Sequence, residues 1–161
     1  MSSQPPGGGS AATAVVHVTR ELRASRDEVF RTWTEPELFE RWFTPPGNAS
    51  VTAELDVRPG GSYRIALQRT PMVPGTSYIV GSYLEVDPPE RLVFTFGWED
   101  PPPMEGLGDL EALDSRVTVQ FRDLGASTEV SIAHERLDTR ELRAFHNWGW
   151  ETTLDQLARI V

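Results

Sequence analysis

Apolar and polar residues alternate through the middle of the chain, which is the pattern of half-buried β-strands. The clearest run starts at residue 51 and ends at the sequence RPGG, and its alternating apolar residues are Val51, Ala53, Leu55 and Val57. Further strands are predicted at residues 62–69, 77–86, 91–98, 116–123 and 127–137, and a first strand, rich in β-branched residues, at 14–22. Because the connections are short, consecutive strands are expected to pair as an antiparallel meander.

Between the first two strands, apolar residues recur at helical spacing in two short segments. Ser25 and Glu28 form a capping-box pattern at the start of a helix expected over 26–33. Pro36 suits the first turn of a second helix, PELFERWF, which the sequence TPPG ends. The pattern therefore predicts two short helices before the main group of strands.

A long helix is predicted at the end of the chain, after a cap at Asp138 or Thr139. At about 100° per residue, one face of it carries His146, Trp150, Thr153, Leu154, Leu157 and Val161. Trp148 points nearly the opposite way. Gly149 costs such a helix roughly 1 kcal/mol relative to alanine, so its missing side chain needs a reason. Either another element packs closely against the helix, or space for a ligand lies beneath it.

This order of elements predicts an α+β domain, in which the helices are segregated from an antiparallel sheet. Only the last helix is long enough to cover the apolar face of the sheet. We therefore expect a curved antiparallel sheet of about six or seven strands wrapped around this helix, with the two short helices closing one end of the groove. Residues 13–161 form this one domain, and residues 1–12 read as a disordered tail without the features of a signal peptide.

Composition narrows the function classes. The net charge is −9, all the basic residues are arginines, and residues 99–114 hold six acids and no base. Such a balance repels nucleic acid and anionic membranes, and no apolar run is long enough for membrane insertion. Without cysteine, the chain has no disulfides or thiolate ligands, which fits a cytoplasmic location.

Motifs for cofactors and nucleophiles are missing from the sequence. The three histidines, His17, His134 and His146, show no metal-ligand spacing, so neither a metal site nor a cofactor is expected. The glycine-rich stretches are not strand-to-helix turns, and no serine lies in a nucleophile elbow.

The segments SRDEVFRTWTEPELFERWFTPPG, GGSYRI, ERLVFTF and H…GWETTLDQL, in this order and spacing, resemble the single-domain relatives of the heat-shock chaperone ATPase activators, the AHSA-type proteins. These belong to the helix-grip (START/Bet v 1-like, SRPBCC) superfamily, with START lipid-transfer domains and polyketide cyclases. The resemblance covers about residues 13–161 and implies a deep apolar cavity between sheet and C-terminal helix that binds hydrophobic small molecules. The acidic loop departs from the family pattern. The separate N-terminal domain of the eukaryotic activators is absent, which weakens the case for a chaperone partner.

Aromatic residues are the first candidates to line such a cavity. Phe94, Phe96 and Trp98 share one face of a predicted strand. Phe94 is expected to fill the core, whereas Phe96 and Trp98, nearer the acidic loop, are better placed to line an entrance. Trp42 and Phe43 are the matching candidates for a rim on the side of the short helices.

Two histidines are the polar candidates. His134 should share the buried face of its strand, and His146 lies on the helix face that carries Trp150. Each is either a satisfied structural group or a polar contact for the carbonyl or hydroxyl of a ligand, and an acid–base role would require a pKa near neutrality. The candidate ligand-binding residues are thus Trp42, Phe94, Phe96, Trp98, His134, His146 and Trp150.

The acidic loop at 99–114 contains three prolines, Met104, and the evenly spaced Leu107, Leu110 and Leu113. It is either a disordered surface insertion or a short amphipathic turn that covers the cavity mouth as a lid or docks on a partner.

Three functions follow from these patterns. The leading hypothesis is a binding module for a hydrophobic small molecule, because no catalytic constellation is visible. The second is a cyclase or dehydratase in which His134 or His146 moves protons. The third is stimulation of a chaperone ATPase through the surface. An outward-facing Trp148 would also suit a homodimer interface.

Overall fold

The computed structural model describes residues 15–45 and 47–161, so the expected tail at 1–12 lies outside the described residues. Every predicted strand and helix is present. In chain order the elements are β1 (Val16–Leu22), α2 (Arg26–Thr34), α3 (Pro36–Trp42), β2 (Asn48–Leu55), β3 (Ser62–Arg69), β4 (Thr76–Asp87), β5 (Arg91–Glu99), η1 (Leu110–Ala112), β6 (Ser115–Asp123), β7 (Thr128–Glu135) and α4 (Arg140–Ile160). The short 3-10 turn η1 lies within the acidic loop, where a short amphipathic turn was one of the two alternatives expected from the sequence.

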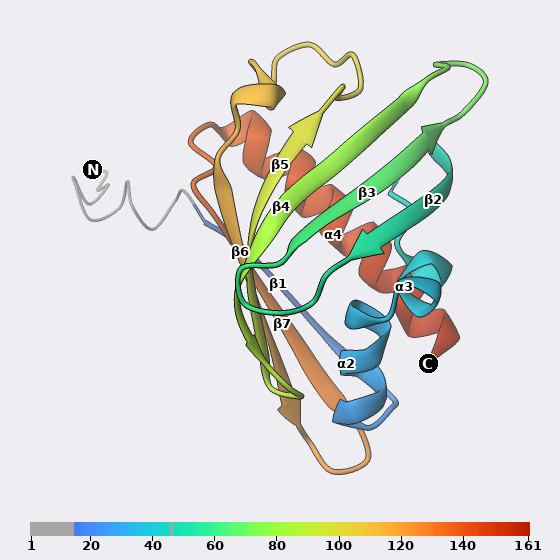
Figure 1. Cartoon of the computed structure of the whole chain (residues 1–161), viewed down its shortest axis with the longest axis vertical. Coiled ribbons are helices and arrows are strands. Elements are labelled where there is room, and N and C mark those ends of the chain that lie inside the picture. The colour runs from blue at the N-terminus through green and yellow to red at the C-terminus, as the bar shows by residue number, and fades with distance from the viewer. Residues whose placement is uncertain (1–14, 46) are drawn as a thin grey trace, which may run out of the picture.

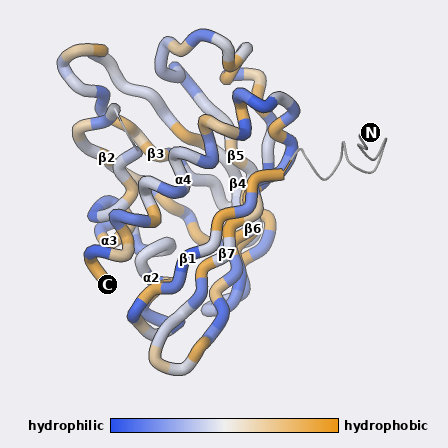
Figure 2. The backbone as a smooth tube through the Cα atoms, turned by 180° about the vertical axis from the view of Figure 1, so that it is seen from behind, coloured by the Kyte–Doolittle hydropathy of each residue, from blue (hydrophilic) through white to orange (hydrophobic). Residues whose placement is uncertain are grey.

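The strands form one antiparallel sheet in the order β1-β7-β6-β5-β4-β3-β2. Apart from β1, which pairs with β7, neighbours in the sheet are neighbours in sequence, as in a meander. The sheet curls, and α4 lies behind it in Figure 1 and in front of it in Figure 2. Where β4 approaches β5, a Cβ on Gly81 would lie 2.0 Å from the carbonyl oxygen of Thr95, so only glycine fits. The predicted α+β helix-grip fold is confirmed.

The core lies between the concave face of the sheet and α4. Along β7, the inward-facing Val130, Ile132 and His134 are all fully buried, as their shared parity predicts. On α4, Trp150 and the residues one and two turns beyond it are buried, whereas the side chain of Trp148 is 52% exposed. No helix of the described part of the chain is long and apolar enough to cross a membrane.

The two short helices close one end of the sheet (Figure 1). The predicted capping box is present, because Ser25 and Glu28 each accept a hydrogen bond from the other's backbone N–H. The rim position expected for Trp42 is wrong. Its side chain is fully buried, and its indole N–H donates to the carbonyl oxygen of Thr32 at 2.8 Å, which ties α3 to α2. Trp42 therefore stabilises the helix pair, and its neighbour Phe43 is the residue that reaches the cavity.

The acidic loop between β5 and β6 is a folded part of the domain rather than a disordered insertion. Leu107 and Leu110 are buried in the main core, and Leu113 packs against it. Asp109 caps η1 by accepting the N–H of Glu111. The loop is therefore anchored by apolar side chains on its inner side while its carboxylates remain at the surface.

Candidate functional site

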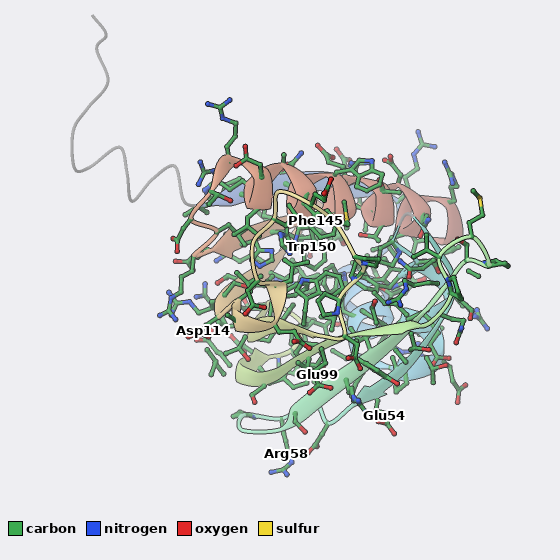
Figure 3. The ribbon with its side chains drawn as sticks, turned by 90° about the horizontal axis from the view of Figure 1, so that it is seen from above. Glu54, Arg58, Glu99, Asp114, Phe145 and Trp150 are labelled. Atoms are coloured by element: carbon green, nitrogen blue, oxygen red, sulfur yellow. The ribbon has the colours of Figure 1, made fainter. Side chains whose placement is uncertain are left out.

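A cavity of about 280 Å³ lies between α4, the strands β3 to β5 and three loops. Its volume is close to the lower end of the range for small-molecule sites. Most of its wall is apolar, and the aromatic residues that line it are Phe43, Phe96, Trp98, Phe145, Trp148 and Trp150. In Figure 3, seen from above, Phe145 and Trp150 lie between α4 and the strands, behind the β5–β6 loop. We call this space the main cavity.

Gly149 lies in the wall that α4 contributes to the main cavity. A Cβ built on it would meet no atom within 4 Å. The expectation that another element packs closely against this glycine is therefore wrong, and the alternative of open space beneath the helix holds. The helix passes over a hollow here, and the absent side chain adds to its volume.

Replacing Gly149 with alanine is expected to raise the free energy of unfolding by about 1 kcal/mol. The helix gains conformational stability, and the added methyl group enters empty space. Urea denaturation of the two proteins measures the difference. A less stable alanine variant would mean that the helix lies closer to its neighbours than the structure places it.

His134 is fully buried behind the main cavity, and both of its ring nitrogens are engaged. The indole N–H of Trp150 donates to Nδ1 at 3.1 Å, so the proton of the neutral ring is on Nε2, which lies 2.8 Å from Ser115 Oγ. The Ser115 hydroxyl in turn donates to the carbonyl oxygen of Phe96. These bonds link α4, β7, β6 and β5 and fit the structural interpretation of His134.

His146 lines the main cavity, and its ring nitrogens are engaged as well. Nδ1 lies 2.8 Å from the carbonyl oxygen of Leu142, one turn earlier in α4. Nε2 accepts the indole N–H of Trp98 at 3.3 Å, which assigns the ring proton to Nδ1. The bond to Trp98 is long and lies at the cavity wall, so it is the weaker of the two.

Burial keeps both imidazoles neutral. Removal from water lowers the pKa of His146 to about 4. Burial, together with the neighbouring His146, lowers the pKa of His134 well below its usual value. The two rings lie 5.0 Å apart between centroids, so protonating one disfavours protonating the other. Neither histidine has the pKa near neutrality that an acid–base role would need.

The predicted site residues fall into three groups. Those that line the main cavity are Phe96, Trp98, His146 and Trp150. Phe94 instead lines a smaller space of about 30 Å³, which we call the inner chamber, together with Tyr63 and Tyr83. His134 and Trp42 line neither space. Trp150 borders both spaces, so its ring is part of the partition between them.

The mouth of the main cavity contains residues that sequence reasoning missed. Arg69 and Ser77, at the facing ends of β3 and β4, supply polar groups to the lining. A signal for Arg69 was present, because it continues the period-two series of inward-facing residues in β3. Pro102, Pro103 and Met104 of the acidic loop also line the cavity, which is the position that a lid requires. In the described part of the chain, no cluster of three or more acidic, histidine or cysteine side chains could hold a metal ion.

Comparisons with known proteins agree with this architecture. The family model for Activator of Hsp90 ATPase homolog 1-like protein matches residues 23–161. The structure of protein CV1439 from Chromobacterium violaceum is similar with a TM-score of 0.75 at 26% identity, over 92% of this chain and 97% of that one. Protein NE0264 from Nitrosomonas europaea is similar with a TM-score of 0.73, also at 26% identity, over 92% and 94% of the two chains.

A third similar structure is the AHSA1 protein SPO3351 from Silicibacter pomeroyi, with a TM-score of 0.72 at 21% identity over 91% of this chain and 96% of that one. At this identity the similarity shows the fold alone. No curated protein matches the chain at a significant level.

Proposed function

The chain belongs to the family of Activator of Hsp90 ATPase homolog 1-like proteins, and from this premise we propose that it binds a hydrophobic small molecule, lipid-like or polyketide-like, in the main cavity. The observation that carries the proposal is the hollow beneath Gly149, where the helix passes over open space walled by aromatic rings. A hollow among apolar side chains forfeits dispersion contacts that a ligand would restore. A ligand would also gain roughly 25 cal/mol for each Å² of apolar surface removed from water.

The weak bond between Trp98 and His146 supports a ligand with one polar group. Both side chains line the main cavity, and their N–H···N distance is 3.3 Å. A ligand carbonyl would accept the indole N–H of Trp98, and a ligand hydroxyl would donate to Nε2 of His146. One such contact would orient a molecule that is otherwise held by apolar packing.

Binding can be tested with N-phenyl-1-naphthylamine, a neutral probe whose fluorescence rises in apolar surroundings. We expect the wild type and the matched control Gly149→Ala to bind it. Gly149→Phe should weaken binding by about tenfold or more, because its ring would occupy the hollow that the ligand needs. Equal binding by Gly149→Phe, or no fluorescence rise with any of the three proteins, would contradict the proposal.

The enzyme hypothesis finds less support. A cyclase or dehydratase of this fold would need His134 or His146 to move protons, and all four ring nitrogens of the two histidines already have partners within the protein. A ligand would first have to displace Trp98 from His146. The neutral state of both rings leaves no proton donor of suitable strength near pH 7.

One observation favours an additional role for the surface. Some of the large apolar side chains that line the main cavity are exposed, and they are Val73, Met104 and Trp148. Such a patch would suit a protein partner, either a chaperone ATPase or a second copy of the chain. An assay of chaperone ATPase stimulation tests the first partner, and a measurement of the oligomeric state tests the second. Both compare the wild type with Trp148→Ala. The cytoplasmic location stays a prediction from the sequence.

A further inference from the structure

Arg69 occupies an unusual position for a charged residue. On β3, the inward-facing series consists of Tyr63, Ile65 and Leu67, all buried, and then Arg69. Arg69 is half-buried and lines the main cavity. A guanidinium group beside an apolar hollow loses part of its hydration, so it needs compensation from neighbouring groups.

The protein groups that accept hydrogen bonds from Arg69 are all uncharged. Its N–H groups donate to the carbonyl oxygens of Val73 at 3.3 Å, Pro74 at 3.0 Å and Asp100 at 3.4 Å, and to Ser77 Oγ. Most other arginines of the described chain pair with a carboxylate, but Arg69 forms no ion pair with any described residue. Its positive charge is therefore hydrogen-bonded but not neutralised.

One donor of Arg69 is left over. A guanidinium group has five N–H donors, and the four hydrogen bonds above leave one on Nη2. Ser77 provides a second donor, because its oxygen accepts from Arg69 while its own O–H donates to no described residue. Ser77 is buried and also lines the main cavity. Arg69 and Ser77 both line the cavity, and each keeps one donor that no described residue accepts.

The loop between β3 and β4 holds the guanidinium group in place. Gly75 has a φ of +118°, and a Cβ there would lie 2.3 Å from Nη2 of Arg69. The glycine therefore leaves room for the guanidinium group to lie against the loop backbone, with bonds to Val73 and Pro74 on the same side. A donor group that is already fixed loses little entropy when a ligand binds to it.

Carboxylates of the acidic loop lie near this mouth, but two of them are engaged elsewhere. Glu99 pairs with Arg64, and Glu111 accepts the backbone N–H of Asp100. Their effect on Arg69 is that of surface charges, which water and salt screen. A carboxylate in direct hydrogen-bond contact with Arg69, beside the low-dielectric cavity, would interact more strongly.

We propose that the ligand is an amphipathic carboxylic acid, whose carboxylate binds to Arg69 and Ser77 at the mouth while its apolar part fills the main cavity toward Trp98 and Trp150. A carboxylate only accepts hydrogen bonds, so it matches the two donors that Arg69 and Ser77 leave unused. It also supplies a negatively charged partner, which Arg69 does not have among the described residues. This inference rests on the proposed function and adds the chemical class of the ligand.

The test compares decanoate with methyl decanoate as competitors of N-phenyl-1-naphthylamine. The two probes share the apolar chain, and only the acid carries a charge. Changing Arg69→Gln should weaken decanoate binding about tenfold or more and change methyl decanoate binding less than about twofold. Arg69→Lys keeps the charge but not the forked donors, so its affinity for decanoate should lie between those of the wild type and of Arg69→Gln.

If the Arg69 variants fold poorly, a measurement on the wild type alone still tests the proposal. Raising the salt concentration should weaken decanoate binding and leave methyl decanoate binding nearly unchanged. If decanoate and its ester bind alike, with no dependence on salt or on Arg69, the proposal of a carboxylate ligand is overturned while the proposed function stands. If the neutral probe does not bind in the first place, both proposals are overturned together.

Discussion

Replacing Trp150 with alanine is expected to lower the free energy of unfolding by about 3–5 kcal/mol. The indole is buried, and its ring centroid lies 5.9 Å from that of Trp33, 6.0 Å from Phe43 and 6.1 Å from Phe96. It also borders both the main cavity and the inner chamber. Its removal would enlarge a hollow that the stiff walls of sheet and helix cannot close.

The same substitution leaves a buried acceptor without its donor. The indole N–H of Trp150 is the partner of His134 Nδ1. Trp150→Phe keeps most of the ring and loses this N–H, so it should cost about 1–3 kcal/mol. The matched control is Trp148→Ala on the same helix, which removes an indole that is 52% exposed and should change stability by about 0.5 kcal/mol or less.

Urea denaturation of the Trp150 and Trp148 variants provides the measurement. The expected order of stability is Trp148→Ala, then Trp150→Phe, then Trp150→Ala. Similar losses for the two alanine variants would show that Trp150 does not fill the partition between the two spaces.

Acid is expected to destabilise the protein through its two buried histidines. An unfolded histidine has a pKa near 6.5, whereas burial lowers that of folded His146 to about 4. Between these pH values the unfolded chain binds more protons than the folded one. The stabilisation is therefore complete above pH 6.5 and is lost progressively as the pH falls toward 4. From His146 alone the loss amounts to roughly 3 kcal/mol.

His134 adds a loss of the same sign, because burial and the nearby His146 also lower its pKa. Urea denaturation at a series of pH values from 7.5 to 4.5 measures the combined loss of stability from the two histidines. His146→Gln is the matched variant, because its amide can accept the N–H of Trp98 but does not titrate. Its stability should fall less steeply with acid than that of the wild type, by up to about 1.4 kcal/mol per pH unit. Parallel pH profiles for the two proteins would rule out this role of His146.

Local patterns in the sequence were sufficient for the secondary structure and for which side chains face inward. The capping box of Ser25 and Glu28 and the buried parity of His134 are as predicted, and Trp150 is buried while Trp148 is exposed. Each depends only on helix or strand geometry within a few residues, and on the need to bury one face of a sheet. The helix-grip fold followed from the order of these elements.

The candidate site was predictable in part. Phe96, Trp98, His146 and Trp150 line the main cavity, as proposed from their faces on one strand and one helix. Arg69 also followed the inward parity of its strand, but an arginine at a strand end reads as a surface residue unless the loops around it are known. The helical spacing of Trp42 does not distinguish a rim position from a buried one. Only the packing of α3 on α2 shows that it is buried.

Only the tertiary structure determined where empty space is left between the packed elements. The sequence determined that a glycine lies between two tryptophans in α4, and that an acidic, leucine-bearing loop follows β5. It did not determine that Gly149 faces open space, or that the loop buries two of its leucines and places Met104 at a cavity mouth. A cavity is the space left between several elements that are distant in sequence. Its size depends on their separation to within about the width of a methyl group, which no local pattern specifies.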